Sequence, residues 1–223
     1  MQLLQLQAHQ GPAYCVEWHP EQRGLLATGA REQLTNFRGL NNSPVWSPDG
    51  RSMALVLSKD GSPDIYLLDL ETKQLTRLTR HYAIDTEPTW MPDGKSLLFT
   101  SDRGGRPQIY RYDLRTKKIK RITFEGAFNA RARVAQDGRN VALVHQRDGR
   151  YHIAVLDLVT DRLTVLTETS LDESPSIAPN GSVVLYATKR GQDDSLRSGL
   201  RKVTGLSSCN RECETPTPCC SCD

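Results

Sequence analysis

Histidine, serine and acidic side chains are the groups in this 223-residue chain that can do chemistry, and their spacing argues against catalysis. His145 and His152 flank the Asp148-Gly149 turn and are expected on neighbouring strands, where the two imidazoles can face each other. Two histidines are fewer ligands than a zinc site uses, so we expect no metal or other cofactor. A serine hydrolase needs a G-x-S-x-G segment, which does not occur in the sequence. We therefore expect a protein that is not an enzyme.

Cysteine is concentrated at the end of the chain, where five of the six cysteines lie between Cys209 and Cys222. A zinc site there would need a second C-x-x-C pair or a nearby histidine, and no histidine follows His152. We expect a disordered tail whose thiols oxidise without fixed pairing, with adventitious metal binding as the alternative.

The elements that position these side chains repeat every 44 residues. Asp49, Asp93 and Asp137, each followed by glycine, are 44 apart, and Asn180-Gly181 follows after 43. Three other markers keep the same phase: the tryptophans Trp46 and Trp90, the strand-ending aspartates and the Leu-Thr or Ile-Thr pairs. A fixed period of this length indicates a repeat architecture.

One unit, residues 86–129, predicts four strands. Short segments rich in β-formers are separated by turn sequences in which proline fixes φ and glycine adopts a positive φ. The expected strands are 86–90, 96–100, 108–112 and 118–123. Such meanders stack radially, so the fold class is all-β, a β-propeller of about 44-residue blades. A β-sandwich would not explain the fixed period.

The pattern fails at both ends of the chain. Trp18 precedes Trp46 by only 28 residues, so the first unit lacks a strand, and residues 33–37 are expected to close it. After Val183–Ala187, only residues 200–204 can add a weak strand. We therefore expect three whole and two partial blades, in a propeller that is incomplete or open, associates with itself or is a fragment.

Composition sets further bounds. The net charge of +3 is nearly balanced, and the basic run from Arg111 to Arg121 is interpreted as a solvated outer strand rather than a nucleic-acid surface. No apolar run approaches the roughly 20 residues that span a bilayer, so no membrane insertion is expected. Residues 1–9 do not form a secretory signal, so the chain as written is expected to stay in the cytoplasm.

Two resemblances divide the chain. Asn41–Gly50, Asp64–Leu70, Asp85–Trp90, Phe99–Gly105 and Leu171–Ser176 resemble the carboxy-terminal six-bladed propeller of the TolB family, periplasmic proteins of the Tol-Pal system in Gram-negative bacteria. Residues 1–32 resemble instead a WD40 unit, with a His-bearing turn at His9 and a Trp strand at Tyr14–Trp18. The expected domains are a WD40-like partial blade (1–32), TolB-like blades (33–192) and a degenerate, cysteine-rich end (193–223).

The TolB resemblance implies a non-enzymatic scaffold that binds the peptidoglycan-associated lipoprotein Pal, supports cell division and outer-membrane integrity, and resides in the periplasm. Other Tol or outer-membrane proteins are further implied partners. The implied partner-binding rim lies on the loops that open the innermost strands. Its residues in this chain are Asp85, Thr86, Glu87, Asn129, Arg131, Asp172 and Glu173.

Two alternatives stay open at this point. The WD40-like segment and the missing export signal favour an intracellular interaction scaffold, and the partial end blades favour a truncated or fused propeller fragment without independent function. Neither the repeat nor the composition decides between them.

Overall fold

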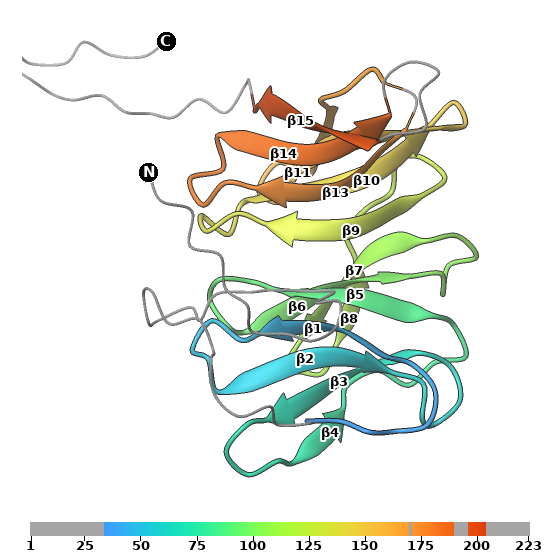
Figure 1. The fold of residues 1–223 in the computed structure, drawn as a ribbon, viewed down its shortest axis with the longest axis vertical. Helices are drawn as coiled ribbons and strands as arrows, with labels where there is room; N and C mark the ends of the chain where they lie inside the picture. Colours follow the sequence, from blue (N-terminus) through green and yellow to red (C-terminus); the bar gives the residue numbers. More distant parts are fainter. Residues whose placement is uncertain (1–33, 170, 190–195, 204–223) are drawn as a thin grey trace, which may run out of the picture.

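The computed structural model describes residues 34–169, 171–189 and 196–203, and these residues form fifteen strands in four antiparallel sheets (Figure 1). Blade 1 contains β1 (Asn41–Trp46), β2 (Ser52–Leu57), β3 (Asp64–Asp69) and β4 (Leu75–Arg77). Blade 2 contains β5 (Asp85–Trp90), β6 (Ser96–Ser101), β7 (Gln108–Asp113) and β8 (Ile119–Arg121). Blade 3 contains β9 (Asn129–Val134), β10 (Asn140–Arg147), β11 (Arg150–Asp157) and β12 (Arg162–Val165). Blade 4 contains β13 (Asp172–Ile177), β14 (Val183–Lys189) and β15 (Leu196–Lys202).

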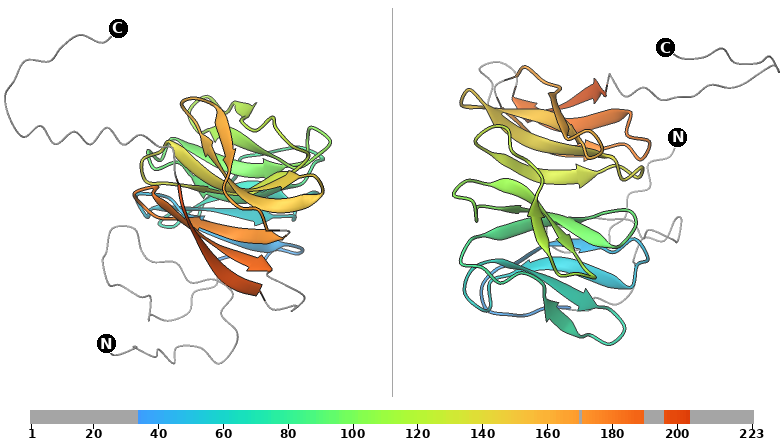
Figure 2. Two further views of the ribbon diagram at one scale, coloured as in Figure 1. Left: turned by 90° about the horizontal axis from the view of Figure 1, so that it is seen from above. Right: turned by 180° about the vertical axis from the view of Figure 1, so that it is seen from behind.

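The blades stack in sequence order. Within each sheet the strands follow one another along the chain, and the first strands β1, β5, β9 and β13 contact their neighbours from blade to blade. Blade 1 and blade 4 lie at opposite ends of the stack, as the two turned views also show (Figure 2). This arrangement confirms the all-β propeller predicted from the 44-residue period. Within the described ranges, no helix is long and apolar enough to cross a membrane.

The core consists of the seams between blades. Alternate residues of each second strand point to opposite neighbours, so Leu97 and Phe99 pack towards blade 1 while Leu98 packs towards blade 3. All three side chains are fully buried. The third seam joins Val144 of blade 3 to Tyr186 of blade 4. A strand buried on both faces explains why the second strands are continuous apolar runs rather than alternating ones.

The turns after the innermost strands follow the predicted chemistry. Gly50, Gly94, Gly138 and Gly181 have φ between 66° and 70°. The residue before each glycine is aspartate in the first three turns and Asn180 in the fourth. Its side chain accepts the amide two residues further on, as in the bond of 2.9 Å from Lys95 N to Asp93 Oδ1. These local bonds are sufficient to fix each turn.

A recurring threonine joins the last strand of a blade to the third. The hydroxyls of Thr79, Thr123 and Thr167 each accept a bond of 2.9 Å from a backbone amide of the third strand. The donors are the amides of Ile65, Ile109 and Ile153 in blades 1, 2 and 3. All three threonines are buried. The Leu-Thr and Ile-Thr markers of the repeat therefore mark a structural bond, and in blade 2 the last strand β8 ends at Arg121 rather than at the predicted Thr123.

The structure corrects the prediction for residues 33–37. Residues 34–37 are irregular instead of forming a closing strand, because the Asn41 side chain bonds both the amide and the carbonyl of Phe37. Leu34 packs on the outer face of blade 1 against buried side chains such as Leu55 and Tyr66. The predicted strand near residues 200–204 is present as β15, which begins earlier, at Leu196. The WD40-like unit at 1–32 and the cysteine-rich tail lie outside the described residues.

Candidate functional site

The face on which the innermost strands begin, here called the rim face, carries most of the exposed large hydrophobic side chains. Because every blade repeats one meander, the segments that precede β1, β5, β9 and β13 all lie on this side. Tyr82 and Phe124 are the most exposed large hydrophobic residues on the rim face, at 86% and 70%. The others on this face are Phe37, Leu40, Ile84 and Leu171, whereas Val159 and Leu185 lie elsewhere. Concentrated exposed apolar groups are typical of protein-binding surfaces.

A bulge at the same point of each innermost strand shapes the rim. Ser43, Glu87, Arg131 and Ser174 have φ between 51° and 56°, and the strand register shifts at each of them. A positive φ is uncommon for residues other than glycine and turns the side chain away from the regular pleat. Proline follows the bulge in three blades, at a position where the ladder needs no amide donor.

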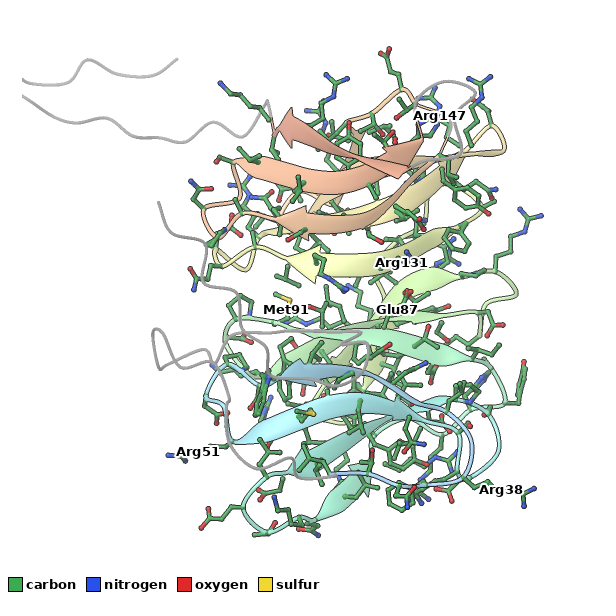
Figure 3. The ribbon with its side chains drawn as sticks, viewed as in Figure 1. Arg38, Arg51, Glu87, Met91, Arg131 and Arg147 are labelled. Atoms are coloured by element: carbon green, nitrogen blue, oxygen red, sulfur yellow. The ribbon has the colours of Figure 1, made fainter. Side chains whose placement is uncertain are left out.

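Charged side chains at three adjacent innermost strands form a continuous network. Arg131 Nε bonds Glu87 Oε1 at 3.1 Å, and Arg131 Nη1 bonds Glu173 Oε2 and Ser174 Oγ, each at 3.2 Å. Glu87 also accepts the Arg131 amide at 3.0 Å and the Thr100 hydroxyl at 2.9 Å. Figure 3 shows Glu87 and Arg131 next to each other between blades 2 and 3. The network therefore crosses blades 2, 3 and 4 through partly exposed groups.

The three residues that open innermost strands are buried instead. Asp85 bonds Arg103 Nη2 at 2.7 Å, Asn129 bonds Gln108 and His145, and Asp172 bonds Thr167 and Thr169. None of the three has exposed surface. We therefore assign them a positioning role, and their direct contact with a partner stays an untested prediction.

The predicted rim residues thus separate into two groups. Glu87, Arg131 and Glu173 meet in one network, and Thr86 lies half-buried beside Glu87, paired across strands with Thr100. Asp85, Asn129 and Asp172 lie beneath them. Tyr82 and Phe124 were not among the candidate binding residues predicted from the sequence. Both lie in loops between blades, where a large apolar residue indicates a candidate binding surface.

The hairpin turns of the rim face add fixed charge. Asp60 accepts the Tyr66 hydroxyl at 2.6 Å and Lys59 Nζ at 2.9 Å. These hydrogen bonds lower the pKa of the Asp60 carboxyl, so it is ionised at neutral pH. Within the part of the chain that the structure describes, no group of three His, Cys, Asp or Glu side chains is arranged to hold a metal ion.

Four antiparallel blades in radial order, three of them four-stranded and one three-stranded in the described residues, define a β-propeller. A family model for the TolB beta propeller domain matches residues 24–207. The chain therefore belongs to the TolB beta-propeller family.

Known relatives agree with this assignment. The Tol-Pal system protein TolB of Ruthia magnifica subsp. Calyptogena magnifica is 57% identical over 165 residues, covering 74% of this chain and 39% of the relative. The crystal structure of TolB from Acinetobacter baumannii superposes with a TM-score of 0.72 at 48% identity, covering 79% of this chain and 46% of that one. A putative TolB from Agrobacterium tumefaciens shares the fold at 23% identity, with a TM-score of 0.66 over 76% of this chain and 64% of its own. The chain thus spans about two-fifths of the length of the Ruthia relative.

Proposed function

We propose that this chain is a non-enzymatic, protein-binding scaffold of the Tol-Pal system, acting in the periplasm by binding the lipoprotein Pal through the rim face. The observation that carries this proposal is that one face of a TolB-family propeller presents both exposed apolar side chains and the Glu87–Arg131–Glu173 network. Roles in cell division and outer-membrane integrity follow from the same assignment. Other Tol or outer-membrane proteins are further candidate partners.

The chemistry of the rim suits a protein partner. Exposed aromatic groups such as Tyr82 and Phe124 are anchors that a complementary surface desolvates, and anchors of this kind supply most of the binding energy of an interface. The Glu87–Arg131–Glu173 network lies at intermediate exposure, where it sets orientation and excludes mismatched partners more than it adds affinity.

Calorimetric titration of the purified chain with the soluble domain of Pal tests the proposal. The decisive variant is the Thr86→Ala, Glu87→Ala pair, which removes a hydroxyl and a carboxylate from the rim. We expect saturable binding to the unaltered chain and affinity about tenfold weaker for the variant, which corresponds to about 1.4 kcal/mol.

A matched double variant controls for nonspecific effects. Glu71→Ala, Gln74→Ala removes two exposed side chains from the β3–β4 turn on the opposite face, and its affinity is expected to equal that of the unaltered chain. Because Glu87 also bonds Thr100 and Arg131, a thermal melt must first show that the rim variant unfolds cooperatively. Equal affinities for both double variants contradict the assignment of Thr86 and Glu87 to the binding site.

A further inference from the structure

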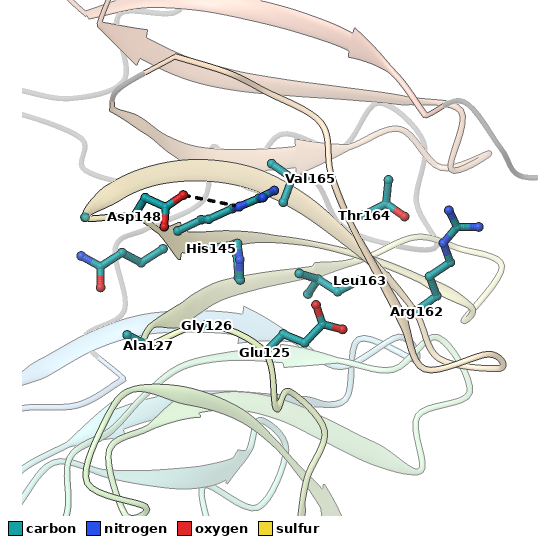
Figure 4. Close-up of a pocket in the computed structure, with 12 residues that line it drawn as sticks. Glu125, Gly126, Ala127, His145, Asp148, Arg162, Leu163, Thr164 and Val165 are labelled. Atoms are coloured by element: carbon teal, nitrogen blue, oxygen red, sulfur yellow. Dashed lines mark ion pairs between the residues drawn. The ribbon is translucent and has the colours of Figure 1, made fainter.

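An open cleft of about 580 Å³ begins on the rim face and runs along the outer strand of blade 3, beside the seam between blades 2 and 3. One wall is the loop before β9, at Glu125–Ala127, and the other is the outer strand β12, at Arg162–Val165. His145 lies between the two walls, and Glu125 lies on the near side of the cleft (Figure 4). His145 as a whole is only 4% exposed, so the cleft ends on a nearly buried polar residue.

Hydrogen bonds fix the proton of His145. Asn129 Nδ2 donates to Gln108 Oε1 at 2.8 Å and to the Glu125 carbonyl at 2.7 Å, so Asn129 Oδ1 is the atom that lies 2.9 Å from His145 Nδ1. An amide oxygen only accepts, so Nδ1 carries the hydrogen. Burial lowers the pKa of His145, which keeps the ring neutral at neutral pH. A neutral imidazole has one N–H, and Nε2 therefore presents a lone pair.

Both acceptors of the cleft lack partners. Among the described residues, neither His145 Nε2 nor the Glu125 carboxylate makes a hydrogen bond or ion pair. The positive charges nearby belong to Arg147, whose Nε lies 3.6 Å from Asp148 Oδ2, and to Arg162, which lies at the outer end of the cleft (Figure 4). The inner end thus offers a carboxylate and an imidazole nitrogen, next to the apolar side chains of Leu163 and Val165.

We propose that this cleft receives a lysine or arginine side chain of the protein that docks on the rim face. The cationic head donates to the Glu125 carboxylate and to His145 Nε2, and the methylene stem lies along Leu163 and Val165. The cleft is open to solvent, so a side chain presented by a docked protein can enter it directly. The inference rests on the proposed function in that it names a chemical feature of the partner.

The test uses the full chain and three small probes. Nα-acetyl-arginine amide is the cation, Nα-acetyl-citrulline amide is its uncharged isostere, and Nα-acetyl-glutamate amide carries the opposite charge. Binding is followed by the NMR shifts of the His145 imidazole at about pH 7.5, above the ordinary histidine pKa. We expect saturable shifts with the arginine probe only.

Charge-neutralising variants locate the site. Glu125→Gln, which leaves the backbone carbonyl bonded to Asn129, is expected to weaken arginine-probe binding at least about tenfold, because a charge-assisted bond is lost. Glu71→Gln removes an equivalent exposed carboxylate from blade 1 and is expected to leave binding unchanged. Equal binding of citrulline and arginine probes, preference for the glutamate probe, or an unchanged Glu125→Gln variant overturns the proposal.

The outcome is separable from that of the Pal titration. Pal-domain binding without any arginine-probe response overturns the cleft assignment and leaves the proposed function standing. Saturable probe binding at His145 without Pal-domain binding supports the cleft and overturns the proposed partner.

Discussion

Replacing Asp85 separates positioning from partner binding at the rim. Asp85 was predicted from the sequence to contact a partner, yet its carboxylate is fully buried and accepts a 2.7 Å bond from Arg103. The Asp85→Ala change removes that bond without touching the backbone bond from the Asp85 amide to Pro63 O, which links blade 2 to blade 1. We expect a loss of stability rather than a direct loss of affinity.

The structure sets the size of this effect. A buried hydrogen bond to a charged group contributes about 1.5–3 kcal/mol. Arg103 is not left alone by the change, because it keeps Ser101 Oγ at 3.0 Å and the rings of Phe99 and Tyr110 at 5.2 and 5.1 Å. Asp85 Oδ1 already has no partner, so alanine also removes a cost of burial. The expected loss is therefore about 2 kcal/mol, near the lower half of that range.

Urea unfolding and thermal melts measure this loss. In a domain of this size, about 2 kcal/mol corresponds to a midpoint shift of about 4–8 °C. The matched control is Glu168→Ala, which removes an exposed carboxylate on the same face at a residue without a positive φ, and its stability is expected to change by less than about 0.5 kcal/mol. An Asp85→Ala chain that melts like the unaltered one but no longer binds the Pal domain would refute the positioning role.

Three further outcomes test the fold and the cleft. Leu98→Ala leaves a cavity at a fully buried site in the seam between blades 2 and 3. We expect it to lower the free energy of unfolding by about 2–5 kcal/mol in urea titrations. A loss below about 1 kcal/mol would show that the blades do not pack there as described. Gly126→Ala places a methyl group against the His145 ring and 2.8 Å from the Gln146 carbonyl at a φ of 73°, so thermal melts should show a loss above about 1 kcal/mol and the arginine probe should no longer shift His145. Burial is the main cause that lowers the pKa of His145 below 6.5; His152 and Arg147 act in the same direction, and Glu125 opposes them. The unfolded chain therefore binds more protons than the folded chain, and the free energy of unfolding falls as the pH drops below about 6.5. His145→Asn, which keeps a donor for Asn129, should flatten that pH dependence in urea titrations, and an unchanged slope would contradict the assignment.

The repeat and the turns could be predicted because their chemistry is local. A positive φ at Gly94 and a side-chain bond from Asp93 to the amide of Lys95 depend on a few neighbouring residues, and the same letters recur in each unit. The turn sequences within one 44-residue unit then separate four predicted strands per blade. The failure at residues 33–37 has the opposite cause, since the Asn41 side chain takes both backbone groups of Phe37, and no pattern of alternation shows that competition.

The sequence placed the rim residues only within short segments, and their role in partner binding stays a prediction. Which of two adjacent acids is buried depends on the strand register and on the bulge, and both are set by pairing with the second strand of the blade. The Glu87–Arg131–Glu173 network joins residues that are 44 and 42 positions apart, so it exists only once three blades are stacked. The cleft beside His145 likewise needs β10, β12 and the loop before β9 together.

The bulge explains how one short strand serves both stability and binding. In a regular strand, Asp85 and Glu87 would point to the same face, because side chains two positions apart share a side. The bulge places Glu87 at a φ of 54° and shifts the register after Thr86, so Asp85 stays buried against Arg103 while Glu87 reaches Arg131 in the next blade. The same geometry recurs at Arg131 beside buried Asn129 and at Ser174 beside buried Asp172. Blades 2, 3 and 4 can therefore vary the bulge residue, and with it the surface offered to a partner, while the buried residue two positions earlier keeps the strand in place.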